Sequence, residues 1–163
     1  MQFKGLHEKT LVIVKPDAVQ RGLVGDIVTR FEKKGLKIVG MKMMRLDEAV
    51  LREHYSHIAD KPFFPGVSNF MQHSPVVVLC LEGLEVVEAI RLITGITKAR
   101  NAEAGSIRGD LAMSVACNVI HASDTVENAK SEVRRFFADE ELFDYSKSEY
   151  EFVYIQDERE SNR

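Results

Sequence analysis

Several features are scarce in this chain of 163 residues, and each scarcity excludes a class of protein. The two cysteines, Cys80 and Cys117, are far apart and form no CxxC pair, so the sequence predicts neither a disulfide framework nor a zinc site. No apolar run approaches the ~20 residues of a membrane span, and the polar N-terminus lacks the apolar core of a signal peptide. We therefore expect a soluble, cytoplasmic protein.

Excess positive charge and the common phosphate-binding motifs are missing as well. The formal net charge is -3 and the pI is near 6.0, so bulk charge gives no support for nucleic-acid binding. The chain has no GxxxxGK[ST] loop, no GxGxxG turn, and no protein-kinase catalytic loop or metal-binding triplet. An enzyme with this sequence that transferred phosphate would have to bind it without these motifs.

What is present indicates one globular domain, residues 1–163, with a charged C-terminal tip that we expect to be mobile. Apolar patterns predict strands over residues 11–14, 36–46 and 76–81 and a brief one at 119–120 that ends at His121. Helical stripes begin at Val24, Asp47, Val86 and, after an Asp124–Glu127 capping box, Val126. Between them lies a long polar loop, residues 95–110.

This order of elements favours an α+β fold, with helices covering one face of a four-stranded sheet. The preferred topology is the split βαββαβ arrangement of ferredoxin-like folds, with an antiparallel sheet. Periodicity alone leaves a small parallel α/β sheet open.

His121 is the residue best suited to chemistry, because it ends an apolar strand just before a helix N-terminus. A neutral imidazole is a nucleophile at cellular pH, and the helix N-terminus favours anions. Glu132, at the edge of the next helix's apolar stripe, would accept Nδ1–H from His121 and leave Nε2 free to attack a phosphoryl group. On local sequence alone, a buried structural histidine is the simpler explanation of His121, and position alone does not distinguish a partner of His121 from a solvated glutamate at Glu132.

Three basic residues, Lys15, Arg91 and Arg108, stand at element ends or in the loop, where fixed cations would neutralise a transferring phosphate. For any one of them, an ordinary surface charge is the simpler explanation. His54 and His57, spaced i and i+3, lack a third ligand at sensible spacing, so no protein-bound metal is predicted.

Several spaced blocks resemble the nucleoside diphosphate kinases over nearly the whole chain. The block from Asn118 to Asp124, Asn-Val-Ile-His-Ala-Ser-Asp, is similar to the active-site signature of that family. The other matching blocks are residues 10–17, 19–25, 53–55, 61–64 and 106–110.

The resemblance implies a kinase that moves the γ-phosphate of a nucleoside triphosphate such as ATP to a nucleoside diphosphate by a ping-pong route through phosphohistidine. It implies a ferredoxin-like fold, His121 as nucleophile, Glu132 as its orienting partner and Ser123 beside them. Lys15, Tyr55, Arg91, Thr97 and Arg108 are expected at the phosphates, Asn118 at the sugar, and Phe63 and Val115 around the base. Mg²⁺ is expected to arrive with the nucleotide, and the chain is expected to form a homo-oligomer, a hexamer or alternatively a tetramer.

The chain departs from the family pattern at a few positions. Ala122 and Ala18 stand where glycine is usual, and Ala99 and Ala104 stand where the family often has proline. If position 122 requires a positive φ, alanine would be strained there. The rival interpretation is a non-catalytic ferredoxin-like module that binds a nucleotide for regulation. The presence of the complete reactive set favours the enzyme, and the net charge disfavours a DNA-binding protein.

Overall fold

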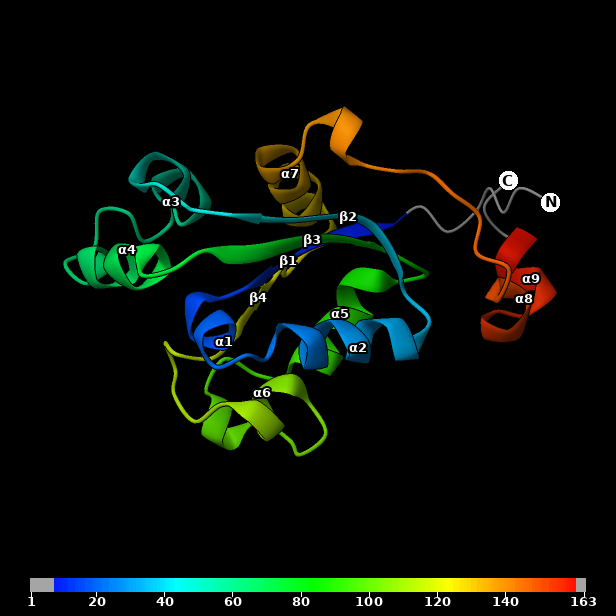
Figure 1. Ribbon diagram of the computed structural model, residues 1–163, viewed down its shortest axis with the longest axis horizontal. Coiled ribbons are helices and arrows are strands. Elements are labelled where there is room, and N and C mark those ends of the chain that lie inside the picture. Colours follow the sequence, from blue (N-terminus) through cyan, green and yellow to red (C-terminus); the bar gives the residue numbers. More distant parts are fainter. Residues whose placement is uncertain (1–7, 161–163) are drawn as a thin grey trace.

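The computed structural model describes residues 8–160, which form a four-stranded sheet with helices packed around it (Figure 1). The strands are β1 (Lys9–Val14), β2 (Lys37–Met44), β3 (Val76–Glu82) and β4 (Ile120–Ala122), in the spatial order β2-β3-β1-β4. All three pairings are antiparallel. The predicted ferredoxin-like α+β topology is confirmed, and the parallel alternative is excluded.

Helices cover both faces of the sheet, so the expectation of a single covered face is wrong. Along β1, Leu11 and Ile13 belong to one core cluster and Val12 and Val14 to another, because successive side chains point to opposite faces. Helices α2 and α5 pack on one face, and α7 packs on the other (Figure 1). Every residue of β3 is buried, as expected for a strand between two helical layers.

The remaining elements are nine helices and two 3-10 turns within residues 8–160. The helices are α1 (Pro16–Gln20), α2 (Val24–Lys34), α3 (Glu48–His54), α4 (Phe64–Gln72), α5 (Val86–Thr94), α6 (Ile107–Leu111), α7 (Val126–Phe136), α8 (Tyr150–Val153) and α9 (Gln156–Glu160), and the turns are η1 (Ala99–Asn101) and η2 (Asp139–Glu141). None of these helices combines the length and apolarity needed to cross a bilayer.

Capping residues account for where two of these helices begin. The Asp47 side chain accepts the amide of Val50 at 2.9 Å, which confirms Asp47 as the N-cap of α3. At α7 the N-cap is Thr125, whose hydroxyl accepts the amide of Asn128 at 3.1 Å, and not Asp124 as the sequence suggested. Asp124 instead binds the side-chain amide of Asn128 at 2.6 Å.

The long loop and the tail are more regular than expected. Residues 95–110 contain η1 and most of α6, which begins where Ser106 caps the amide of Gly109. The tail runs along β2, where the amide of Phe143 donates to the carbonyl of Val39 at 2.8 Å, and it ends in α8 and α9. Residues 161–163 of the predicted mobile tip lie outside the described residues.

Candidate active site

A large cleft opens beside β4, the short strand whose middle residue is His121. It has a volume of about 1670 Å³ and collects side chains from β4, α3, α5, α7 and the loop after α5. Nine of the eleven predicted site residues line it: Lys15, Tyr55, Arg91, Thr97, Arg108, Val115, Asn118, His121 and Glu132. Two others, Phe63 and Ser123, do not. The cleft is large enough to hold a nucleoside triphosphate.

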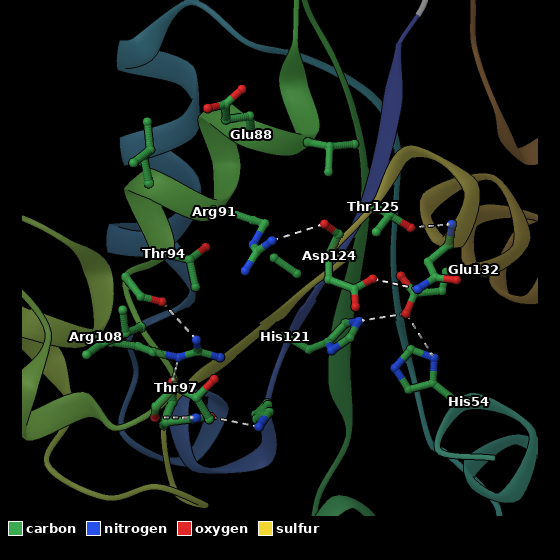
Figure 2. A pocket seen from close by; sticks show the side chains of 18 of the residues that line it. His54, Glu88, Arg91, Thr94, Thr97, Arg108, His121, Asp124, Thr125 and Glu132 are labelled. Carbon is green, nitrogen blue, oxygen red and sulfur yellow. Dashed lines mark hydrogen bonds and ion pairs between the residues drawn. The ribbon is translucent and has the colours of Figure 1, made fainter. Parts of the chain in front are cut away.

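His121 lies between two arginines and a carboxylate with a second histidine. Figure 2 shows Arg91 and Arg108 on one side of its ring, and Glu132 with His54 on the other. The imidazole is partly exposed, at 21%, whereas the Glu132 side chain is largely buried, at 11%. The ring therefore has one edge toward the protein and one toward the cleft.

The two ring nitrogens have the reverse of their predicted roles. The Nε2 atom of His121 lies 3.0 Å from Oε1 of Glu132, so Nε2 carries the proton that the carboxylate accepts. This tautomer leaves the lone pair on Nδ1. Glu132 lies at hydrogen-bond distance from the ring, but it contacts Nε2, so the free nitrogen is Nδ1 and not Nε2 as predicted.

Ser123 supports the carboxylate from behind and does not face the cleft. It is fully buried, its hydroxyl donates to Oε2 of Glu132, and it accepts the amide of Leu11 at 3.3 Å. Burial alone raises the pKa of Glu132, but hydrogen bonds from His121 and Ser123 outweigh burial and hold that pKa below its usual value. Glu132 is therefore ionised near neutral pH, as an acceptor of Nε2–H requires.

The two arginines differ in how they are held. Arg108 is buried and donates to three backbone carbonyls: Nε to Asn118 at 3.3 Å, Nη1 to Gly95 at 3.0 Å and Nη2 to Ile120 at 2.6 Å. These bonds use three of its five N–H groups and leave two for a ligand. Burial lowers the pKa of Arg108 to about 10, so it stays charged at neutral pH.

Arg91, by contrast, is exposed at the C-terminal end of α5. Its Nη1 atom donates to the carbonyl of Asp124 at 3.1 Å, and Figure 2 shows the guanidinium beside His121. Its other donors make no hydrogen bond within residues 8–160 and are available to a phosphate.

Lys15 and Asn118 form one unit at the base of the cleft. Lys15 Nζ donates to Oδ1 of Asn118 at 2.7 Å, and the Asn118 amide donates to the carbonyls of Thr97 and Val115 at 3.1 and 2.9 Å. Burial, and then the charge of Arg108, lower the pKa of Lys15 to about 8. Both amide protons of Asn118 are used, so only its Oδ1 oxygen can still bind a ligand, as an acceptor.

Three further predicted residues, Tyr55, Phe63 and Val115, differ in how they lie relative to the cleft. Tyr55 follows α3, and burial raises its pKa to about 12, so its phenol stays neutral and can donate to an anion. Phe63 and Val115 are strongly exposed apolar side chains, at 58% and 49%. Val115 lines the cleft, whereas Phe63 precedes α4 and is not part of the lining.

Backbone strain occurs at Val119 and not at Ala122. Within residues 8–160 the only non-glycine residues with positive φ are Glu85 and Val119, and Val119 has φ of 65°. A β-branched residue rarely adopts this conformation. Two hydrogen bonds hold it: its amide donates to Asp17 Oδ2 at 3.1 Å and its carbonyl accepts the Lys15 amide at 2.9 Å. Ala122 is therefore an unstrained replacement for glycine.

Sequence reasoning missed the contribution of His54, which it considered only as a metal ligand with His57. Its ring packs edge-on against His121, with centroids 4.5 Å apart, and its Nδ1 atom lies 3.7 Å from Glu132. A signal was available, because His54 belongs to one of the blocks that resemble the kinase family. Sequence spacing alone does not bring residues 54 and 121 together.

Comparison with known proteins identifies the family of this chain. Residues 8–142 match the family model described as nucleoside diphosphate kinase. A nucleoside diphosphate kinase of Parabacteroides distasonis is 52% identical over 151 residues, which cover 93% of this chain and 99% of that protein. The chain belongs to the nucleoside diphosphate kinase family.

Other members of this family agree in sequence and in structure. The Pyrococcus abyssi nucleoside diphosphate kinase is 49% identical over 145 residues, which cover 87% of this chain and 91% of that protein. The solved structure of the halophilic enzyme from Halobacterium salinarum, in complex with CDP, has a TM-score of 0.87 at 46% identity and covers 90% of this chain and 98% of its own. The chain is accordingly a phosphotransferase that passes the γ-phosphate of a nucleoside triphosphate to a nucleoside diphosphate through phosphohistidine.

Proposed function

We propose that His121 is the residue that carries the phosphate, and that Nδ1 is the nitrogen that attacks. In the first half-reaction a bond forms between Nδ1 and the γ-phosphorus as the bond from that phosphorus to the β-bridging oxygen breaks, and the nucleoside diphosphate leaves. The second half-reaction reverses this step with a different diphosphate. The observation that carries the proposal is the 3.0 Å contact of Nε2 with Glu132, because in the neutral ring it places the proton on Nε2 and the lone pair on Nδ1.

Glu132 acts by keeping the proton on Nε2 while positive charge develops on the ring. An ionised carboxylate stabilises the imidazolium character of the transition state through the same hydrogen bond. Ser123 keeps Glu132 in place through the other carboxylate oxygen. Ser123, Glu132 and His121 form a chain of hydrogen bonds that fixes the orientation of the imidazole. Of the three, only His121 contacts the substrate.

The cations of the cleft neutralise the phosphates. Arg91 and the two free N–H groups of Arg108 are proposed to bind the transferring phosphoryl group, because charge-assisted bonds to phosphate are stronger than neutral ones. Lys15, Tyr55 and Thr97 donate to the remaining phosphate oxygens. Lys15 also reaches the ribose.

The nucleoside is proposed to bind through stacking and through a single amide oxygen. Asn118 accepts from a ribose hydroxyl through Oδ1, its one remaining polar position. Val115, which lines the cleft, is proposed to contact one face of the base, and Phe63, which is exposed outside the lining, is kept as its partner on the strength of the family resemblance. Every base has a face that can stack, so this arrangement explains a broad range of nucleotide substrates.

Mg²⁺ is proposed to enter with the nucleotide and not to occupy a site built by the protein. Within the part of the chain that the structure describes, the one group of three possible metal ligands is His54, His121 and Glu132. Two imidazoles and one carboxylate do not match the all-oxygen set that Mg²⁺ prefers. Bound to the phosphates, the ion would offset their charge, and the residues of this chain would hold the phosphates through the arginines and Lys15.

A homo-oligomer, with a hexamer preferred over a tetramer, remains our proposal for the assembly. Its support is the sheet edge: β2 is an edge strand, and Met41 and Met43 on it are 51% and 61% exposed. An exposed edge strand can pair with another chain, and exposed apolar side chains beside it favour such an interface. A monomeric mass in light scattering would contradict this proposal.

The free thiols of Cys80 and Cys117 support a reducing, cytoplasmic location, which cell fractionation would test.

Labelling with γ-³²P-ATP tests the catalytic assignment. We expect acid-labile, base-stable label on the chain, and we expect His121→Ala to lose both label and turnover while its unfolding midpoint is unchanged. The matched control is His73→Ala, because His73 is an exposed histidine outside the cleft. Label that persists in His121→Ala would assign the phosphate to another residue.

A further inference from the structure

His54 packs against the ring of His121, the proposed nucleophile, on the same side as Glu132 (Figure 2). It is the last residue of α3, and its side chain is completely buried. Its ring packs edge-on against three aromatic rings: His121 at 4.5 Å, Tyr55 at 4.8 Å and Phe136 at 5.3 Å between centroids. The ring cannot turn without displacing one of these neighbours.

The imidazole of His54 is neutral at physiological pH. Burial is the largest cause, and the neighbouring His121 and Arg135 add to it against the opposing charge of Glu132, so the pKa falls to about 3. A neutral imidazole carries one proton, on either Nδ1 or Nε2, and the other nitrogen is an acceptor. The neighbours of the ring decide which nitrogen has the proton.

Arg135 makes that decision for Nδ1. One turn after Glu132 on α7, it places Nη1 at 3.1 Å from the Nδ1 atom of His54. A guanidinium has only donors, so Nδ1 must accept and the proton must be on Nε2. Nε2 has no hydrogen-bond partner among residues 8–160 in either tautomer, so it does not compete in this choice. Glu53 fixes Arg135 from the other side, with Oε1 at 3.2 Å from Nε.

The choice of tautomer matters because Nδ1 of His54 also faces the catalytic carboxylate. It lies 3.7 Å from the same Oε1 atom of Glu132 that accepts from His121. A proton on Nδ1 would turn His54 into a second donor, and a small shift would bring it within bonding distance of that oxygen. The lone pair that Arg135 imposes prevents this competition.

We propose that Arg135 is a positioning residue that fixes His54 as the Nε2–H tautomer and so reserves Oε1 of Glu132 for His121. This inference rests on the proposed function of His121 and Glu132. It assigns Arg135 a role that is exerted through its hydrogen bond to His54 and not through a hydrogen bond to His121.

The test compares Arg135→Met with Arg134→Met in the full chain. Arg134 is exposed on the same helix, so its replacement removes the same charge without touching His54. Nitrogen-15 NMR of histidine-labelled protein distinguishes protonated from unprotonated ring nitrogens. We expect His54 to be the Nε2–H tautomer in the wild type and in Arg134→Met, and to contain a substantial Nδ1–H fraction in Arg135→Met.

Kinetics provide the second readout. In Arg135→Met we expect kcat to fall about tenfold, within the range of couplings measured inside one hydrogen-bond network, with little change in KM. Arg135→Lys, which keeps a donor at this position, should restore most of the rate. In a His54→Leu background Arg135→Met should have no further effect, because the competing donor is already gone.

Each outcome bears on the inference separately from the phosphohistidine assignment. An unchanged tautomer in Arg135→Met, or a changed tautomer with a normal kcat, would overturn it. An equal loss of rate in the His54→Leu background would also overturn it, because Arg135 would then act by another route. The tautomer measurement needs no turnover, so it remains informative even if labelling moves the phosphate from His121 to another residue.

Discussion

Replacing Arg91 or Arg108 with alanine removes one cation beside His121, yet the two variants should differ in stability. Arg108 donates to three backbone carbonyls: Gly95, which caps the end of α5, Asn118, two residues before β4, and Ile120, the first residue of β4. Arg91 donates to one carbonyl and is otherwise exposed. We therefore expect both variants to lose activity and only Arg108→Ala to lose substantial stability.

The expected magnitudes follow from these contacts. Loss of one electrostatic donor to a transferring group costs about 2–4 kcal/mol in kcat/KM, and we expect this loss for each variant. A hydrogen bond to a charged group contributes about 1.5–3 kcal/mol to stability, and a carbonyl that loses its partner without gaining water costs about 1–3 kcal/mol. Because water reaches part of this cleft, we expect Arg108→Ala to lose at least about 2 kcal/mol of unfolding free energy in total, and Arg91→Ala no more than about 0.5 kcal/mol.

Two measurements on each variant decide the matter. The first is kcat/KM with adenine, guanine and pyrimidine diphosphates as acceptors, and the second is urea unfolding. A phosphate role predicts the same loss for every base, so a loss confined to one base would refute it. Equal unfolding free energies for the two variants would refute the structural role assigned to the three carbonyl contacts of Arg108.

Two further predictions concern the base of the cleft and the loop. Because burial and the charge of Arg108 lower the pKa of Lys15 to about 8, Lys15 loses its proton as pH rises from 7 to 9. Nucleotide affinity measured by calorimetry should therefore fall over that range in the wild type and stay nearly constant in Lys15→Arg; parallel curves would contradict the phosphate role of Lys15. Ala104 precedes Gly105, which has φ of 94°, in a turn closed by the Ser106 amide and the Glu103 carbonyl, and proline suits the position of Ala104 in such a turn. Ala104→Pro should raise unfolding free energy by about 0.4–1 kcal/mol with unchanged turnover, and a lowered melting midpoint at matched protein concentration would show that the backbone there rejects proline.

The sequence predicted most of the sheet because the strands carry their own signal. Residues 76–81 of β3 and residues 11–14 of β1 are continuous apolar runs, which are typical of strands buried on both faces. Short helices have no such signal. Five residues in α6 are too few for a 3.6-residue period, and only Ser106 marks where the helix begins.

The site was predictable in its members and less so in its geometry. The resemblance to the family implied roles for His121 and Glu132, but no sequence pattern states which ring nitrogen contacts a carboxylate, because that depends on side-chain rotation. The contact of His54 with His121 joins residues 67 positions apart, so it exists only after β1, α3 and β4 are in place. Ser123 was expected beside the histidine, and burial behind Glu132 gives it a supporting role instead.

The segment from Lys15 to Asp17 explains why the strained residue is Val119 and why the strain persists. In the sequence this segment looks like a turn that ends a strand, but its groups hold the backbone just before β4: the Lys15 amide binds the Val119 carbonyl, and the Asp17 carboxylate binds the Val119 amide. Strained conformations persist where the surroundings over-determine them. In the same segment Lys15 Nζ donates to Asn118. The residues at the start of α1 therefore both fix the backbone that leads to His121 and supply a cation to the cleft. Substitution of glycine by alanine at position 122 is tolerated because the positive φ that this path requires falls three residues earlier.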